Sequence, residues 1–161
     1  MKILLVLVTL LFSRNTESIN RQAPKTYCNN RFGYCINYPL FLIPQRESYN
    51  GDGRVFINKE GKLILTVFGR LNMDVDGNAI PLSKQYAADT KELLAAKVTI
   101  TYKKLGKGFY VLSGTKQEKI FYRKVILKGD AFCFALLEYA AAGKAIYDSV
   151  SADIFRSFKC Y

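Results

Sequence analysis

The chain contains no histidine among its 161 residues, and this absence removes a large share of enzyme chemistry. Histidine is the commonest general base, and it takes part in Ser-His-Asp triads and in most catalytic zinc sites. The sequence also lacks a glycine-rich phosphate loop and the Gly-x-Ser-x-Gly turn of hydrolases. An enzyme built from this chain would have to use carboxylates, Tyr, Lys or Ser. We therefore assign no catalytic residue, no cofactor and no metal ligand.

The chain has no apolar run of about 20 residues, the length that a membrane-spanning helix requires. The run from Ile3 to Phe12 is much shorter. It follows Lys2 and precedes the polar stretch 13–18, which is the pattern of a secretory signal peptide. We expect residues 1–18 to be a signal peptide, residues 19–31 to be an N-terminal extension, and the protein to be secreted or periplasmic. An uncleaved membrane anchor is the alternative.

Cysteine is scarce, and the four cysteines all follow the predicted signal: Cys28, Cys35, Cys133 and Cys160. An even number of cysteines in an exported chain favours disulfides. A zinc site is the competing interpretation, and the missing His and the missing Cys-x-x-Cys spacing argue against it. We favour the pairs Cys28–Cys35 and Cys133–Cys160. The pairs Cys28–Cys160 and Cys35–Cys133 remain the alternative.

Acidic residues are few: 13 Asp and Glu stand against 24 Lys and Arg, which gives a net charge of +11. The excess is concentrated between Lys97 and Lys128, where nine basic residues accompany one acid, Glu118. Such a surface attracts anionic lipid, acidic glycan or an acidic protein, whereas export argues against nucleic acid. A solvated face that keeps edge strands from aggregating is the alternative. The candidate anion-binding residues are Lys103, Lys104, Lys107, Arg123 and Lys124.

The sequence does contain an ordered series of strand and helix patterns. Alternation predicts a strand at about 32–39. Turn signals then set off a hairpin with strands at 55–58 and 63–69. A helix is predicted from Pro81 to about Ala96, because proline opens helices well and Leu82, Tyr86 and Leu93 form an apolar stripe.

From residue 97 onward the apolar period is two. Four strands at about 97–103, 109–115, 119–127 and 131–139, joined by short turns, predict an antiparallel meander. The last strand is apolar on both faces, so we expect layers on both sides of the sheet. A final helix at about 142–158 would form one layer through Ile146, Val150, Ile154 and Phe158. The predicted fold class is α+β, with the hairpin and meander packed between helices in one domain, 32–161.

The segment Tyr34-Cys35-Ile36-Asn37-Tyr38-Pro39 is an aromatic-alternating strand closed by Tyr-Pro. It resembles the start of domains with the PsbP-type fold, which have a similar order of elements and a closing helix. The resemblance would cover residues 32–159. It implies a non-catalytic binding or accessory module, which we expect to be monomeric. It carries over no ligand-binding residue, because the functions found on that fold are diverse.

Two alternatives of other classes remain open. One is a weak hydrolase that uses carboxylates and Tyr in a cleft near Asp52 and Asp74, for which a carboxyl group of raised pKa would be the sign. The other is a purely structural component of an envelope or secreted matrix. The loop at 72–78 also imitates the first half of a calcium-binding loop. Ser83 stands where that loop needs its bidentate Glu, so we predict a polar loop without calcium.

Overall fold

A seven-stranded antiparallel sheet organises the structure, a computed structural model that describes residues 23–161. The predicted signal peptide lies outside the described residues. The strand order is β3-β4-β5-β9-β8-β7-β6. The strands are β3 (Ile43–Pro44), β4 (Gly53–Ile57), β5 (Leu63–Leu71), β6 (Thr99–Gly106), β7 (Phe109–Lys116), β8 (Lys119–Lys128) and β9 (Ala131–Ala140).

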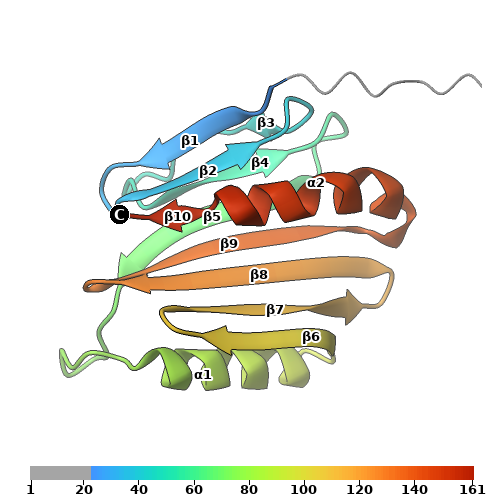
Figure 1. The fold of residues 1–161 in the computed structure, drawn as a ribbon. Helices are drawn as coiled ribbons and strands as arrows, with labels where there is room; N and C mark the ends of the chain where they lie inside the picture. The colour runs from blue at the N-terminus through green and yellow to red at the C-terminus, as the bar shows by residue number, and fades with distance from the viewer. Residues whose placement is uncertain (1–22) are drawn as a thin grey trace, which may run out of the picture.

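The predicted meander is confirmed, because β6 to β9 pair antiparallel in chain order (Figure 1). Gly108 and Gly129 lie in its turns with φ of 83° and 56°, a conformation that glycine adopts without steric cost. The predicted hairpin is β4–β5. Its second strand, β5, pairs with β9, so hairpin and meander form one continuous sheet.

A second, smaller sheet has the order β1-β2-β10. Its strands are β1 (Lys25–Asn29), β2 (Tyr34–Tyr38) and β10 (Lys159–Cys160). The strand predicted at 32–39 is β2, and it pairs here rather than in the main sheet. The structure places β1 within residues 19–31, the segment predicted to be an N-terminal extension. Three of its five residues are exposed, so it shows little apolar pattern before β2 pairs with it.

Two helices cover opposite faces of the main sheet. Helix α1 (Leu82–Ala95) packs along β6 and β7. Helix α2 (Lys144–Ser157) follows a short 3-10 turn, Ala141–Gly143, and packs against β2 and β9. The expected apolar stripe of α1 is confirmed, with Leu93 buried and Leu82 and Tyr86 partly buried in the same core.

The stripe of α2 differs from the expected one at its first turn. Ile146 is 56% exposed, whereas Tyr147 is buried and its ring stacks on Tyr139, with 4.7 Å between ring centroids. Ile154 and Phe158 are buried as expected. The helix begins later than predicted. Its buried face includes Phe158 and Ile154, and in the first turn it includes Tyr147 rather than Ile146.

Strand β9 contributes to the cores on both faces, as its sequence predicts. Cys133, Ala135 and Leu137 belong to the core on the α2 side. Phe132 and Phe134 belong to the core on the α1 side. Because successive residues of a strand point to opposite faces, one strand can serve two layers. The α+β fold class, with an antiparallel sheet between helices, is therefore confirmed.

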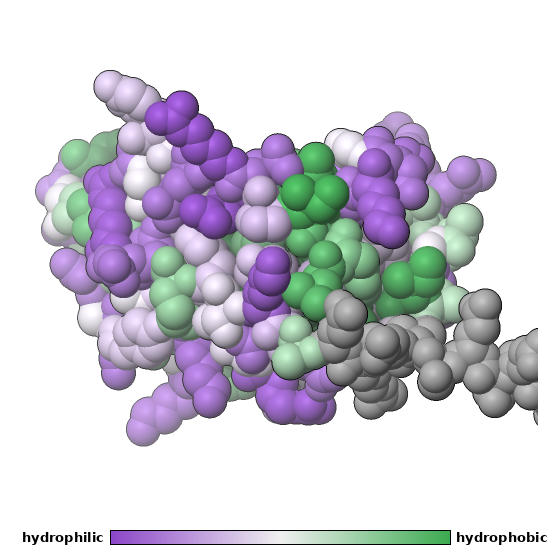
Figure 2. Space-filling model, turned by 90° about the horizontal axis from the view of Figure 1, so that it is seen from above, coloured by the Kyte–Doolittle hydropathy of each residue, from purple (hydrophilic) through white to green (hydrophobic). Residues whose placement is uncertain are grey.

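The edge of the main sheet formed by β3 to β5 is apolar. Ile43 pairs with Ile57 and Ile57 with Leu63, and Ile43 and Leu63 are 45% and 52% exposed. Seen from above, hydrophobic residues are grouped on part of the surface among hydrophilic ones (Figure 2). Between residues 23 and 161, neither helix has the length and apolar character needed to cross a membrane.

Candidate anion-binding surface

Helix α2 lies over β9 and contacts Tyr122 and Lys124 of β8, and it leaves the same face of β6 and β7 uncovered (Figure 1). Directly paired residues of neighbouring strands point to the same side of a sheet. The register places Val111 opposite both Lys124 and Lys104, and Phe109 opposite Ile126. Tyr102 and Lys104 are exposed, and the remaining side chains are partly exposed. We call this surface the open face. It consists of Tyr102, Lys104, Phe109, Val111, Lys124 and Ile126.

Three of the five predicted residues, Lys103, Lys104 and Lys107, lie exposed on the β6–β7 hairpin. Within residues 23–161, none of them has a carboxylate oxygen within 4.0 Å. The Lys104 ammonium lies 5.9 Å from the ring centroid of Phe109, which is a cation–π contact. Lys103 stands opposite Leu112, a member of the core on the α1 side. Lys104 therefore belongs to the open face, whereas Lys103 points to the other side.

A hollow of about 280 Å³ lies at the hairpin end of the open face. The Leu127 N–H donates to the Gly108 carbonyl at 2.8 Å, which fixes the hairpin turn against β8. Cationic and apolar groups together suit a ligand group that is itself both anionic and apolar. The hollow is lined by Lys107, Gly108, Phe109, Lys124, Ile126 and Leu127.

Lys124 connects this hollow to the end of helix α2. Its ammonium donates to the carbonyls of Phe155 and Phe158, at 2.6 Å and 3.1 Å. Carbonyls at a helix C-terminus carry partial negative charge, so they stabilise the ammonium. Burial lowers the pKa of Lys124, and the neighbouring Lys159 lowers it further. An ammonium has three N–H donors, so one remains beyond these two hydrogen bonds.

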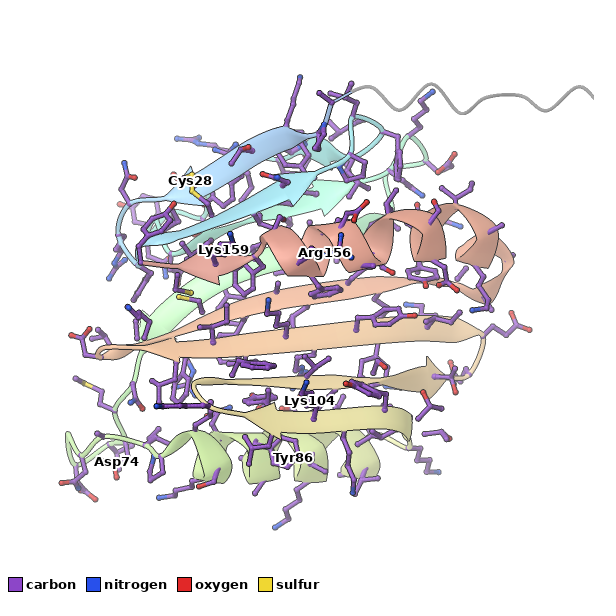
Figure 3. The ribbon with its side chains drawn as sticks, viewed as in Figure 1. Cys28, Asp74, Tyr86, Lys104, Arg156 and Lys159 are labelled. Atoms are coloured by element: carbon purple, nitrogen blue, oxygen red, sulfur yellow. A yellow bond between two sulfur atoms is a disulfide. The ribbon has the colours of Figure 1, made fainter. Side chains whose placement is uncertain are left out.

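Lys159 is a basic residue of this region that sequence reasoning missed. It is exposed on β10, which lies against β8. Figure 3 shows Lys159 beside the end of α2, and Lys104 farther away on β6. Its position depends on the pairing of β10 with β2 across the length of the chain, and no local pattern could have indicated it.

Arg123 belongs to a buried network on the opposite side of β8. Its Nη1 lies 2.8 Å from Asp89 Oδ2, and Asp89 is only 4% exposed. The Tyr110 hydroxyl donates to the same oxygen at 2.5 Å, and Gln85 Nε2 donates to Asp89 Oδ1 at 2.6 Å. Burial and the Asp89 carboxylate raise the pKa of Tyr110. Arg123 therefore anchors α1 to the sheet and is not free to bind an external anion.

The five predicted residues thus do not form one site. Adjacent residues of a strand point to opposite faces, so a run of basic residues along a strand is divided between two surfaces. Lys103 and Arg123 lie on the α1 side. The structure brings together Lys107 and Lys124, which both line the hollow, with Lys104 on the same face.

Asp52, one of the two carboxylates of the alternative hydrolase, holds its own loop together. Its Oδ1 accepts from Ser48 Oγ and its Oδ2 from Asn50 Nδ2, both at 2.7 Å. Ser48 Oγ in turn accepts the N–H of Asp52 at 3.1 Å and that of Gly53 at 3.0 Å. This carboxylate is engaged in turn structure.

Asp74, the other carboxylate, caps the loop at 72–78. Its Oδ1 accepts the N–H of Asn78 at 2.8 Å and that of Asp76 at 3.0 Å, and these bonds, led by the one from Asn78, lower the pKa of Asp74. A general acid needs the opposite shift. In the part of the chain that the structure describes, no three His, Cys, Asp or Glu side chains gather as a metal site would require.

The cysteines lie in two places on one side of the main sheet. The predicted Cys28–Cys35 disulfide is present and joins directly paired residues of β1 and β2, which excludes the alternative pairing. Cys133 and Cys160 are thiols in the structure, and both pack in the core on the α2 side. The second predicted pair is therefore adjacent but not bonded. A disulfide is typical of exported and lumenal proteins.

Comparison with known proteins addresses the fold. No family model matches the chain, and no curated protein matches its sequence. The solution structure of cyanobacterial PsbP (CyanoP) from Synechocystis sp. PCC 6803 matches with a TM-score of 0.59 and 15% identity, over 89% of this chain and 96% of that one. A crystal structure from Bacteroides thetaiotaomicron matches with a TM-score of 0.46 and 10% identity, over 85% of this chain and 48% of its own. The match to CyanoP shows that the chain has a PsbP-like α+β fold.

Proposed function

We propose that the chain is an exported, non-catalytic binding or accessory module whose open face binds an anionic partner. The observation that carries the proposal is the position of Lys104 and Lys107. They lie at the hairpin end of an uncovered sheet face, and no described carboxylate pairs with them. Positive charge without an internal partner attracts anions from solution.

The apolar residues between the lysines favour binding over a merely solubilising role. Phe109, Val111 and Ile126 are partly exposed, so a bound partner can cover them. Apolar contact adds to charge attraction, which salt screens when it acts alone. The alternative of a lysine face that protects an edge strand suits Lys103 better, because its side chain points away from this surface.

The buried polar groups of the described chain support binding over catalysis. Asp89 Oδ2 is engaged by Tyr110 and Arg123 of the sheet, and Oδ1 accepts from Gln85 of the same helix. The lowered pKa of Asp74 opposes a role as a general acid. These groups serve the structure, whereas the lysines of the open face are available to a partner.

We further propose that the protein works in an oxidising compartment, secreted or periplasmic, as a monomer. The Cys28–Cys35 disulfide supports this proposal, and so does the pattern of residues 1–18, which is that of a signal peptide. Anionic lipid, acidic glycan and an acidic protein are the partner classes reachable there.

Binding measurements at two salt concentrations test the proposal. The mature, oxidised chain is titrated with vesicles of anionic phospholipid, sulfated and uronic glycans, polyglutamate and single-stranded DNA. We expect salt-sensitive binding to one class. The variant Lys104→Gln/Lys107→Gln should weaken it about tenfold, because two charge contacts of roughly 0.7 kcal/mol each are lost.

The matched control is Lys103→Gln/Lys116→Gln, which removes the same charge from the same hairpin. Lys103 faces the α1 side and Lys116 lies at the far end of β7 from the Lys107 turn. The control should change the affinity less than twofold. Equal losses in both variants, or no binding to any class, would contradict the assignment of the open face.

A further inference from the structure

Cys133 and Cys160 carry an inference that is independent of the binding role. Cys133 is fully buried in β9, and Cys160 is partly exposed in β10. Both pack in the same core on the α2 side of the main sheet. Two thiols in this position, in a chain that already holds one disulfide, form a potential redox pair.

The fold holds both cysteines near residues 32–34, where the turn after β1 leads into β2. Cys160 pairs with Tyr34, and the N–H of Tyr161 donates to the Gly33 carbonyl at 2.8 Å. Cys133 Sγ lies 3.7 Å from the Phe32 carbonyl. Their proximity therefore follows from backbone pairing on both sides.

The surroundings give the two sulfur atoms different roles. The neighbouring Cys133 thiol lowers the pKa of Cys160, and the positive charges of Lys124 and Lys128 lower it further. The same contact, together with burial, raises the pKa of Cys133. A thiolate is the nucleophile in disulfide exchange, and Cys160 is also the more accessible of the two.

We propose that Cys133 and Cys160 form a second, reversible disulfide that links the two sheets, with a low-molecular-weight disulfide such as glutathione disulfide as the oxidant. The Cys160 thiolate attacks one sulfur of glutathione disulfide, the S–S bond breaks, and one glutathione thiolate leaves. Cys133 then loses its proton to that thiolate and attacks the Cys160 sulfur, which displaces the second glutathione. Two electrons pass from the cysteine pair to glutathione disulfide.

This bond would differ from the existing one in what it joins. Cys28–Cys35 connects two strands of the small sheet. Cys133–Cys160 would connect β10 of the small sheet to β9 of the main sheet, and the loop that it closes contains helix α2. Its formation or loss therefore acts on the attachment of the C-terminal strand.

Peptide mapping at controlled redox potential tests the proposal. The folded chain is first incubated with glutathione and then equilibrated with increasing proportions of glutathione disulfide. Free thiols are blocked with N-ethylmaleimide in denaturant before trypsin digestion without reductant. Cleavage after Lys and Arg would leave the new bond between peptides 129–144 and 160–161, and Cys28–Cys35 between peptides 26–31 and 32–46.

We expect the linked peptide 129–144/160–161 to increase from a minor to the major form as glutathione disulfide increases. In Cys133→Ser, Cys160 should accumulate as the mixed disulfide with glutathione, because no second thiol displaces it. In Cys160→Ser, Cys133 should remain maleimide-labelled at every ratio, because it is buried. Maleimide on both cysteines of the unsubstituted chain at every ratio, or stable glutathione on Cys160 without the linked peptide, would overturn the proposal.

Discussion

At the scale of single residues, Asp89 joins α1 to the main sheet through a buried polar network. Its carboxylate is nearly fully buried between α1 and the sheet, forms an ion pair with Arg123 and accepts hydrogen bonds from Tyr110 and Gln85. Removing one partner of a buried ion pair leaves the other charge without compensation in a region of low polarity. The network is therefore sensitive to the loss of either charged member.

Asp89→Ala should destabilise the protein by about 3–5 kcal/mol, because Arg123 and Tyr110 lose their buried acceptor. Urea denaturation of the variant gives the free energy of unfolding. Asp153→Ala is the control, since Asp153 and its partner Arg156 are both largely exposed and this pair should contribute little. If both variants lost the same stability, the Asp89 network would not anchor α1.

Asp148 gives a prediction about pH. The hydrogen bond from Lys144, and then that from Tyr139, lower the pKa of Asp148. The unfolded chain therefore binds this proton more tightly, so the stabilisation is present above about pH 4 and is lost as the pH falls through the folded-state pKa. Asp148→Asn should remove this part of the acid dependence of stability.

The expected size is below about 1 kcal/mol, because the Asp148 side chain is 34% exposed and solvent screens the pair. The measurement is the free energy of unfolding of both proteins between about pH 5 and pH 2, a window set by the usual carboxyl pKa. An acid limb of unchanged slope in Asp148→Asn would contradict the prediction.

At this scale, the sequence predicted which residue types matter better than it predicted their grouping. The concentration of lysines was visible, and Lys104 and Lys107 do lie on one side of the hairpin. The ion pair between Arg123 and Asp89 could not be predicted from the sequence, because the two residues meet only when α1 packs on the sheet. The sequence shows where charged residues are concentrated, whereas the ion pairs that they form depend on tertiary contacts.

Among the elements, the edge strand β6 depends on a close approach to β7. Gly114 pairs with Ile100, and the register shifts between Ile100 and Tyr102, which is the sign of a β-bulge. A Cβ at Gly114 would overlap the carbonyl oxygen of Thr99. The glycine is needed here because the two backbones approach closely.

Gly114→Ala should destabilise the protein by about 1–3 kcal/mol, since the overlap with backbone forces β6 to shift. Hydrogen exchange is the sharper readout, because amides of β6 should exchange faster while those in the centre of β8 change less. Thr115→Ala, at an exposed position of the same strand, is the control. Unchanged exchange in β6 would show that the bulge absorbs the added methyl group.

The long elements were predictable because their patterns are local. The helix predicted at 81–96 is found at Leu82–Ala95, and the four meander strands lie where alternation and turn residues place them. The short strands β3 and β10 were not predicted. Each has only two residues, too few to show an alternating pattern, and β10 also pairs with a strand distant in sequence.

For the whole molecule, the sheet joins two cores into one cooperative unit. Strands β8 and β9 place side chains in both, for example Cys133 on the α2 side and Phe132 on the α1 side. Loss of one core therefore exposes the strands that support the other. Interdependence of this kind favours unfolding in a single transition.

Equilibrium unfolding should accordingly give coincident transitions by far-ultraviolet circular dichroism and by tyrosine fluorescence. The chain contains 11 Tyr and no Trp, so tyrosine alone reports the tertiary environment. In Asp89→Ala both curves should move to lower denaturant together. Two separated transitions would show that the cores unfold independently.

The pairing of β5 with β9 has a consequence for the order of synthesis. The β4–β5 hairpin can pair with β9 only after residues 131–140 have been synthesised. Strand β2 can pair with β10 only after residues 159–160 have been synthesised. Contacts between distant segments slow folding, because the intervening chain must be ordered first. The nascent chain cannot complete the main sheet before residue 140 has been made, or the small sheet before residue 160. For the exported protein proposed above, which would cross a membrane unfolded, this delay favours translocation.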